Sequence, residues 1–179
     1  MAGPAFACPG AEDLAVGIAF LSDGGEFEFH RALGEGLIRS QRLTALGEPV
    51  GRESIAKHGI YMVSTRLDGA DQRYTWTAGI EALPYPQLGV TTEQRVIITQ
   101  QAFDYPGFFT LSVGDTPIQI RFPDCQLEAW GVAAEMELGD DLGFATFYQW
   151  FPSLGTGIPV RWSENGEVTG SQEIVGIEW

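Results

Sequence analysis

The chain has 179 residues, of which 44% are hydrophobic and 19% charged, as is typical of one globular domain that folds without a metal or a disulfide. Its formal net charge of −14 repels phosphate backbones and anionic lipid surfaces, which argues against nucleic acids and membrane surfaces as partners. No apolar run approaches the roughly 18 residues that a spanning helix needs, so we expect a soluble domain without a membrane span.

The N-terminal segment, residues 1–13, contains Ala5-Phe6-Ala7, which has the small-x-small form of a signal-peptidase site. We therefore expect this segment to follow a removed export signal, and the protein to be periplasmic or secreted in a bacterial envelope. Cys8 and Cys125 lack the spacing of a zinc or redox pair. Three fates of Cys8 stay open: a disulfide with Cys125, a free thiol, and a lipid-modified mature N-terminus.

Apolar and polar side chains alternate with a period of two along the first half of the domain, which predicts strands with one buried face. The turn sequence Ser22-Asp23-Gly24-Gly25 is expected to close the first hairpin. A polar stretch through Pro49, Gly51 and Ser54 is expected to connect two strands. The strands predicted in this half are residues 14–20, 27–33, 36–43, 60–66 and 73–80.

The second half of the chain continues the same alternation. Residues 96–99, Val-Ile-Ile-Thr, are β-branched at every position and favour a strand over the helix that residues 91–94 could begin. Gly114-Asp115 is expected to turn one strand into the next, and Asn165-Gly166 predicts a hairpin with a type I′ turn. The strands predicted here are residues 96–99, 109–113, 118–122, 130–138, 144–151, 160–163 and 168–177.

These patterns predict an all-β fold, with a single domain over residues 14–179 and about eleven mainly antiparallel strands. Consecutive hairpins favour a meander, either barrel-like in the manner of lipocalins or folded into a two-sheet sandwich. Pro86-Gln87-Leu88-Gly89 and Pro152-Ser153-Leu154-Gly155 echo each other. A weak duplication of a half-domain, residues 14–89 and 93–179, would produce this echo.

Motifs for catalysis or for a cofactor are absent from the sequence, and no cofactor or metal is expected. His30 is predicted on a polar strand face and His58 in a loop, both as surface residues. The acidic turns Asp68-Gly69-Ala70-Asp71 and Gly139-Asp140-Asp141 lack the spacing of a calcium loop and are expected to be hairpin turns. Carboxylates that could serve a hydrolase are Asp104, Asp115, Asp124, Glu135 and Glu137.

Aromatic residues within the predicted strands are the most informative remaining feature. Such rings either fill a wide β core or line a site for an apolar molecule or a sugar. In residues 148–151, alternation sends Tyr148 and Trp150 to one face and Gln149 and Phe151 to the other. The candidate ligand-binding residues are Trp76, Trp130, Tyr148, Trp150, Phe151 and Trp162.

Three classes of function are consistent with these features. The expected function is a non-enzymatic binding module that holds a small apolar or amphipathic molecule. The alternative is an envelope structural or protein-interaction domain with a filled core, whose partner is another envelope protein. A carboxylate-dependent hydrolase ranks third. The sequence leaves the oligomeric state open.

Overall fold

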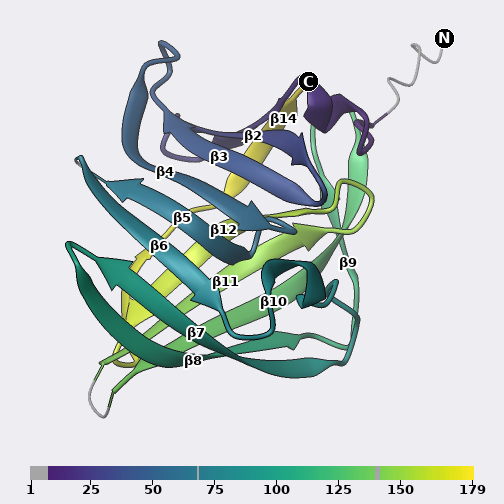
Figure 1. The fold of residues 1–179 in the computed structure, drawn as a ribbon. Coiled ribbons are helices and arrows are strands. Elements are labelled where there is room, and N and C mark those ends of the chain that lie inside the picture. The colour runs from purple at the N-terminus through teal and green to yellow at the C-terminus, as the bar shows by residue number, and fades with distance from the viewer. Residues whose placement is uncertain (1–7, 68, 140–141) are drawn as a thin grey trace, which may run out of the picture.

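A computed structural model describes residues 8–67, 69–139 and 142–179 (Figure 1). The predicted signal-peptidase sequence, Ala5-Phe6-Ala7, lies outside these residues, as do Asp68, Asp140 and Asp141 of the two acidic turns. None of the described helices is long and apolar enough to cross a membrane.

The described chain is all-β, and its fourteen strands exceed the expected number of about eleven. Two short 3-10 helices, η1 (Asp13–Ala15) and η2 (Ile80–Ala82), are the described helices. The strands are β1 (Ile18–Ser22), β2 (Phe27–Gly34), β3 (Leu37–Leu43), β4 (Pro49–Lys57), β5 (Tyr61–Leu67), β6 (Ala70–Trp76), β7 (Thr91–Gln100), β8 (Phe103–Val113), β9 (Ile118–Arg121), β10 (Gln126–Leu138), β11 (Leu142–Phe151), β12 (Thr156–Glu164), β13 (Glu167–Ser171) and β14 (Ile174–Glu178).

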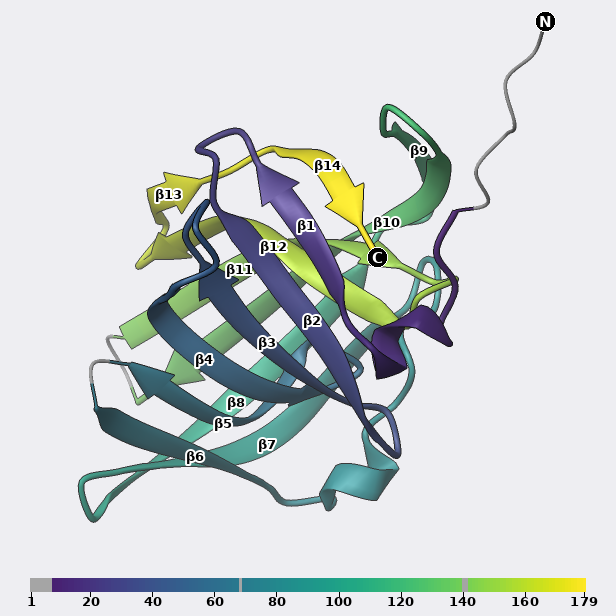
Figure 2. The ribbon, with the colours of Figure 1, turned by 90° about the horizontal axis from the view of Figure 1, so that it is seen from above.

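All strands belong to one antiparallel sheet, in the order β13-β12-β11-β10-β8-β7-β6-β5-β4-β3-β2-β1-β14, with β9 paired to β10. The sheet curls so that β2–β5 face β10–β12 across its interior (Figures 1 and 2). It is not a closed barrel, because within the described residues no pairing joins its ends, β13 and β14. It is not a two-sheet sandwich either, because the described strands belong to one sheet.

Those two ends are instead joined by a short piece of chain. The backbone N–H of Gln172 donates to Val160 O of β12 at 2.9 Å, and that of Asp23 beside β1 donates to Glu173 O at 2.9 Å. The C-terminal segment therefore passes from one end of the sheet to the other between β13 and β14 (Figure 2). The duplication of residues 14–89 and 93–179 stays a prediction.

The predicted turn at Gly114-Asp115 joins β8 to β9 as a bend, because the two strands pair with β10 and not with each other. Val113 of β8 pairs with Val132 of β10, and Ile118 of β9 pairs with Ala129 of the same strand. The Gly114 N–H donates to Gly131 O at 2.9 Å, which keeps the turn attached to β10. Because β10 has 13 residues, β8 and β9 fit end to end along one of its edges.

Strand β4 occupies the stretch that was expected to be a polar connection. Ser54 and Ser40 face each other from β4 and β3 with their hydroxyl oxygens 2.7 Å apart, and Arg39 pairs with Glu53 at 2.7 Å. Both strand faces are polar here, so the hydrophobic alternation that marks other strands is missing.

The last hairpin confirms its predicted turn. Asn165 and Gly166 have φ angles of 49° and 83°, the positive values that a type I′ turn requires at both central positions. Glu164 and Glu167 pair directly across this turn.

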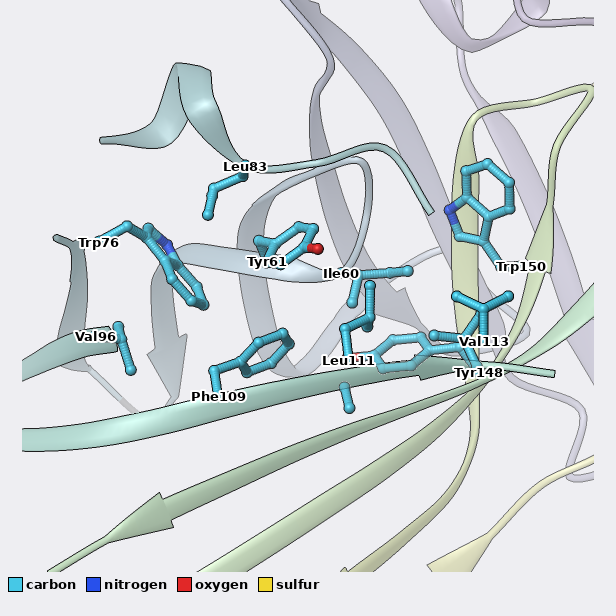
Figure 3. Packing of buried hydrophobic residues seen from close by; sticks show 12 residues of the cluster. Ile60, Tyr61, Trp76, Leu83, Val96, Phe109, Leu111, Val113, Tyr148 and Trp150 are labelled. Atoms are coloured by element: carbon cyan, nitrogen blue, oxygen red, sulfur yellow. The ribbon is translucent and has the colours of Figure 1, made fainter. Parts of the chain in front are cut away.

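Two clusters of buried side chains form the core. In the larger, the rings of Tyr61, Trp76 and Phe109 meet pairwise with centroids 5.2–5.5 Å apart (Figure 3). In the second, Phe20 stacks on Phe151 at 5.6 Å. Aromatic pairs at such separations add to the free energy gained by burial.

Candidate functional site: a cavity inside the sheet

A cavity of about 810 Å³ lies inside the curled sheet. Leu67, Gln100, Leu142 and Glu164 line it beside the turns that join β5 to β6, β7 to β8, β10 to β11 and β12 to β13. At its other end it reaches Phe109 of the larger core cluster. This volume lies within the range of about 300–1,000 Å³ that is typical of small-molecule sites.

One wall of the cavity is apolar. It is built by β7, β8, β10 and β11, in which every second residue points inward. Beside the turns this wall stays accessible to solvent, because Tyr105, Leu142 and Phe144 are 45%, 38% and 39% exposed. The apolar lining side chains are Ile98, Phe109, Ala134, Met136, Leu138 and Phe144.

The facing wall comes from β2–β6 with the end of β7 and carries most of the polar lining side chains, together with the apolar Ile60, Met62 and Leu67. Gln72 is its centre, because its Oε1 accepts from the hydroxyls of Thr65 and Tyr74, each at 3.1 Å. The Gln72 Nε2 in turn donates to Gln100 Oε1 at 3.1 Å. These bonds hold the two amide side chains in fixed orientations. The polar lining side chains of β2–β7 are Glu28, Arg42, Arg52, Ser54, Gln72 and Gln100.

Charges of both signs occur on the polar wall. Arg42 pairs with Glu26 at 2.6 Å and also donates to Gln172 Oε1 at 3.1 Å. Arg52 forms no ion pair with a described residue. Glu28 faces Arg42 as its cross-strand partner. The wall therefore offers both hydrogen-bond donors and acceptors to a molecule in the cavity.

His30 lies in the interior, which corrects its expected surface position. It is 1% exposed, and its Nδ1 is 2.8 Å from Thr156 Oγ1. Its Nε2 is 3.7 Å from Glu28 Oε1 and has no hydrogen-bond partner among the described residues. The predicted alternation of β2 is correct, but the two faces are exchanged: His30 points inward and Phe29 outward. Phe29 packs against Gly17, where a Cβ would lie 2.1 Å from the ring.

The six candidate aromatic residues separate into two groups. Tyr148 and Trp162 line the cavity, and Tyr148 also belongs to the larger core cluster. Burial raises the pKa of Tyr148 to about 12, while Arg52 acts in the opposite direction. The Trp162 indole lies against Gly170, where a Cβ would be 2.4 Å from the ring. Trp76, Trp130, Trp150 and Phe151 pack in or against the core clusters, and their role as ligand contacts stays a prediction.

Neither a protein-family model nor a curated protein nor a solved structure matches this chain.

The five carboxylates singled out in the sequence do not gather at the cavity. All five are exposed, and Glu135 and Glu137 point away from it because the inward positions of β10 are Ala134 and Met136. The carboxylates that do line the cavity, Glu28 and Glu164, were not singled out. Among residues 8–67, 69–139 and 142–179, no three His, Cys, Asp or Glu side chains gather as a metal site.

His58 lies at the opposite end of the sheet, in the turn between β4 and β5. Its backbone carbonyl accepts a hydrogen bond from Trp150 Nε1 at 3.1 Å, and its ring meets Tyr85 edge to face at 5.0 Å. Burial lowers the pKa of His58, and the neighbouring Lys57 lowers it further. This turn packs against the core through Ile60, which also lines the cavity, whereas His58 does not.

The disulfide, one of the three fates left open for Cys8, is absent from the structure, in which Cys8 and Cys125 are free thiols. The Cys8 thiol donates to the backbone oxygen of Gln126, next to Cys125, at 3.2 Å. Burial raises the pKa of Cys125 to about 12, and the adjacent Cys8 thiol contributes to the rise. The N-terminal segment is thereby attached to the start of β10.

We expect Cys125 to be alkylated by iodoacetamide at about pH 8 at least about 100-fold more slowly in the folded protein than in urea, because the thiolate is the reacting species. Peptide mass spectrometry measures each cysteine separately. The variant Cys8→Ser is expected to accelerate the reaction only in part, because burial is the larger cause of the raised pKa. Equal rates in folded and unfolded protein would contradict this prediction.

Proposed function

We propose that this protein is a non-enzymatic binding module of the bacterial envelope that holds a small amphipathic ligand in the cavity. The observation that carries the proposal is a cavity of about 810 Å³ with an apolar wall opposite a wall that bears most of its polar and charged side chains. The periplasmic or secreted location rests on the export-type sequence Ala5-Phe6-Ala7. Release of the protein from its native cells by osmotic shock would support this location, and recovery in the cytoplasmic fraction would oppose it.

The apolar wall supplies the driving force in this proposal. An apolar chain that covers Met136, Leu142 and Phe144 removes their exposed surface from water, at roughly 25 cal/mol per Å². The opposite wall pairs the polar part of the same molecule with amide, hydroxyl and charged groups, so that little polar surface is buried without partners. An amphipathic molecule suits both walls at once, whereas a wholly apolar one suits only the first.

The other two functions have weaker support. A structural or interaction domain with a filled core predicts no cavity of this size. A carboxylate hydrolase needs two acidic groups at a defined separation across a bound substrate. The five carboxylates expected to serve that role are exposed on the outside of the sheet.

The proposal is tested by titrating the protein with N-phenylnaphthylamine, an uncharged fluorophore whose emission rises in apolar surroundings. We expect saturable binding to one site per chain, and competition by single-chain amphiphiles below their micelle concentrations. Native mass spectrometry of the purified protein is expected to detect the same one-to-one complex. Absence of saturable binding in both measurements would overturn the proposed function.

A further inference from the structure

The imidazole of His30 has a hydrogen-bonding nitrogen that is directed toward the cavity wall. The ring is fixed on one side by Thr156 Oγ1 at 2.8 Å and by the edge-to-face contact with Phe20 at 5.5 Å. Its Nε2 points to Glu28, which lines the cavity, yet their separation of 3.7 Å is too long for a hydrogen bond. A buried nitrogen without a partner is costly, so this position favours a polar atom supplied by a ligand or by water.

A ligand hydroxyl can reach the Glu28 member of this pair, because Glu28 lines the cavity and His30 does not. When Thr156 donates to Nδ1, the neutral imidazole carries its proton on Nε2, on the side of the ring that faces Glu28. The Glu28 carboxylate then accepts a hydrogen bond from a hydroxyl in the cavity. Ser40 and Ser54 continue the same register row across β3 and β4, and Ser54 also lines the cavity. This row therefore suits a headgroup with more than one hydroxyl.

Charged headgroups gain little net attraction from the same wall. A carboxylate would face Arg52 but also Glu28, and an ammonium group would face Glu28 but also Arg52. The Arg42 charge is already paired with Glu26 at 2.6 Å. Because each sign of charge meets both an opposite and a like charge here, the wall suits an uncharged group that both donates and accepts.

We propose that the cavity selects amphiphiles with an uncharged, hydroxyl-bearing headgroup, that Glu28 is its specificity-determining contact, and that the buried His30 acts through Glu28 as a positioning residue. This inference rests on the ligand-binding function proposed above. It names a chemical class, a single apolar chain that ends in a polyol or a sugar, and it places the head against β2–β4 and the chain against β8, β10 and β11.

The test compares three amphiphiles that share a dodecyl-length chain: monolauroylglycerol, laurate and dodecyltrimethylammonium. Each competes with N-phenylnaphthylamine below its micelle concentration. We expect monolauroylglycerol to bind at least about tenfold more tightly than either charged amphiphile, as befits hydrogen bonds to a carboxylate in a partly buried site. Equal affinities, or preference for a charged head, would overturn the headgroup inference and leave the binding function standing. Failure of the fluorophore and of all three amphiphiles to bind would overturn both.

Two variants assign the preference to residues. Glu28→Met keeps an unbranched side chain without its oxygens, and it is expected to weaken monolauroylglycerol binding about tenfold while binding of the fluorophore is unchanged. Glu93→Met, on the outer face of β7, removes the same charge outside the cavity. It is expected to change neither monolauroylglycerol binding nor fluorophore binding. His30→Phe keeps the ring shape and is expected to reproduce the Glu28 effect. An unchanged headgroup preference in folded Glu28→Met protein would remove the assignment.

Discussion

Two added aromatic rings on the inner face of β10 are expected to abolish ligand binding. In the double variant Ala134→Phe, Met136→Trp, both new rings project into the cavity, since both positions line it. They occupy volume that the ligand needs and cover the apolar wall with protein, so the hydrophobic gain on binding is lost. We expect affinity for N-phenylnaphthylamine to fall by at least about 100-fold, or roughly 2.7 kcal/mol.

The same strand supplies the matched control. Ala133 and Glu135 alternate with the cavity positions and point to the outer face of β10. Ala133→Phe, Glu135→Trp adds the same two rings to the protein without entering the cavity, and it is expected to bind the fluorophore as the native chain does. Circular dichroism and urea unfolding establish that both variants fold. Native affinity in the folded inner-face variant would place the ligand elsewhere and overturn the cavity assignment.

Most strands could be predicted from the sequence because their inner faces are apolar and their outer faces polar. The prediction failed where this contrast is missing. Residues 49–57 form β4, yet Arg52 and Ser54 point into the cavity and the outer face is polar as well. The turn between β8 and β9 could be predicted from Gly114-Asp115, but the pairing of both strands to β10 could not, because it depends on contacts remote in sequence.

The candidate site was predictable only in part, for the same reason. The rule that polar side chains face water sent His30 outward, although here the interior of the sheet contains a polar wall. Of the six aromatic candidates, Tyr148 and Trp162 line the cavity, but aromatic content alone could not separate cavity-lining rings from rings that fill the core. Glu28 could not be recognised among the many acidic residues of the sequence, because its position in the cavity lining depends on how the sheet curls. No local pattern encodes that curl.

Removal of the Trp150 side chain is expected to cost about 3–5 kcal/mol of the free energy of unfolding. The indole is 0% exposed, meets Tyr85 and Trp130 at centroid separations of 4.8 and 5.1 Å, and donates to His58 O at 3.1 Å. Trp150→Ala therefore leaves a cavity and a buried carbonyl without its donor, and the midpoint of urea unfolding should fall accordingly. Trp179→Ala makes the same change at a residue that is 48% exposed, where we expect a change within about 0.5 kcal/mol. Equal midpoints for the two variants would mean that Trp150 does not anchor the end of the sheet opposite the cavity turns.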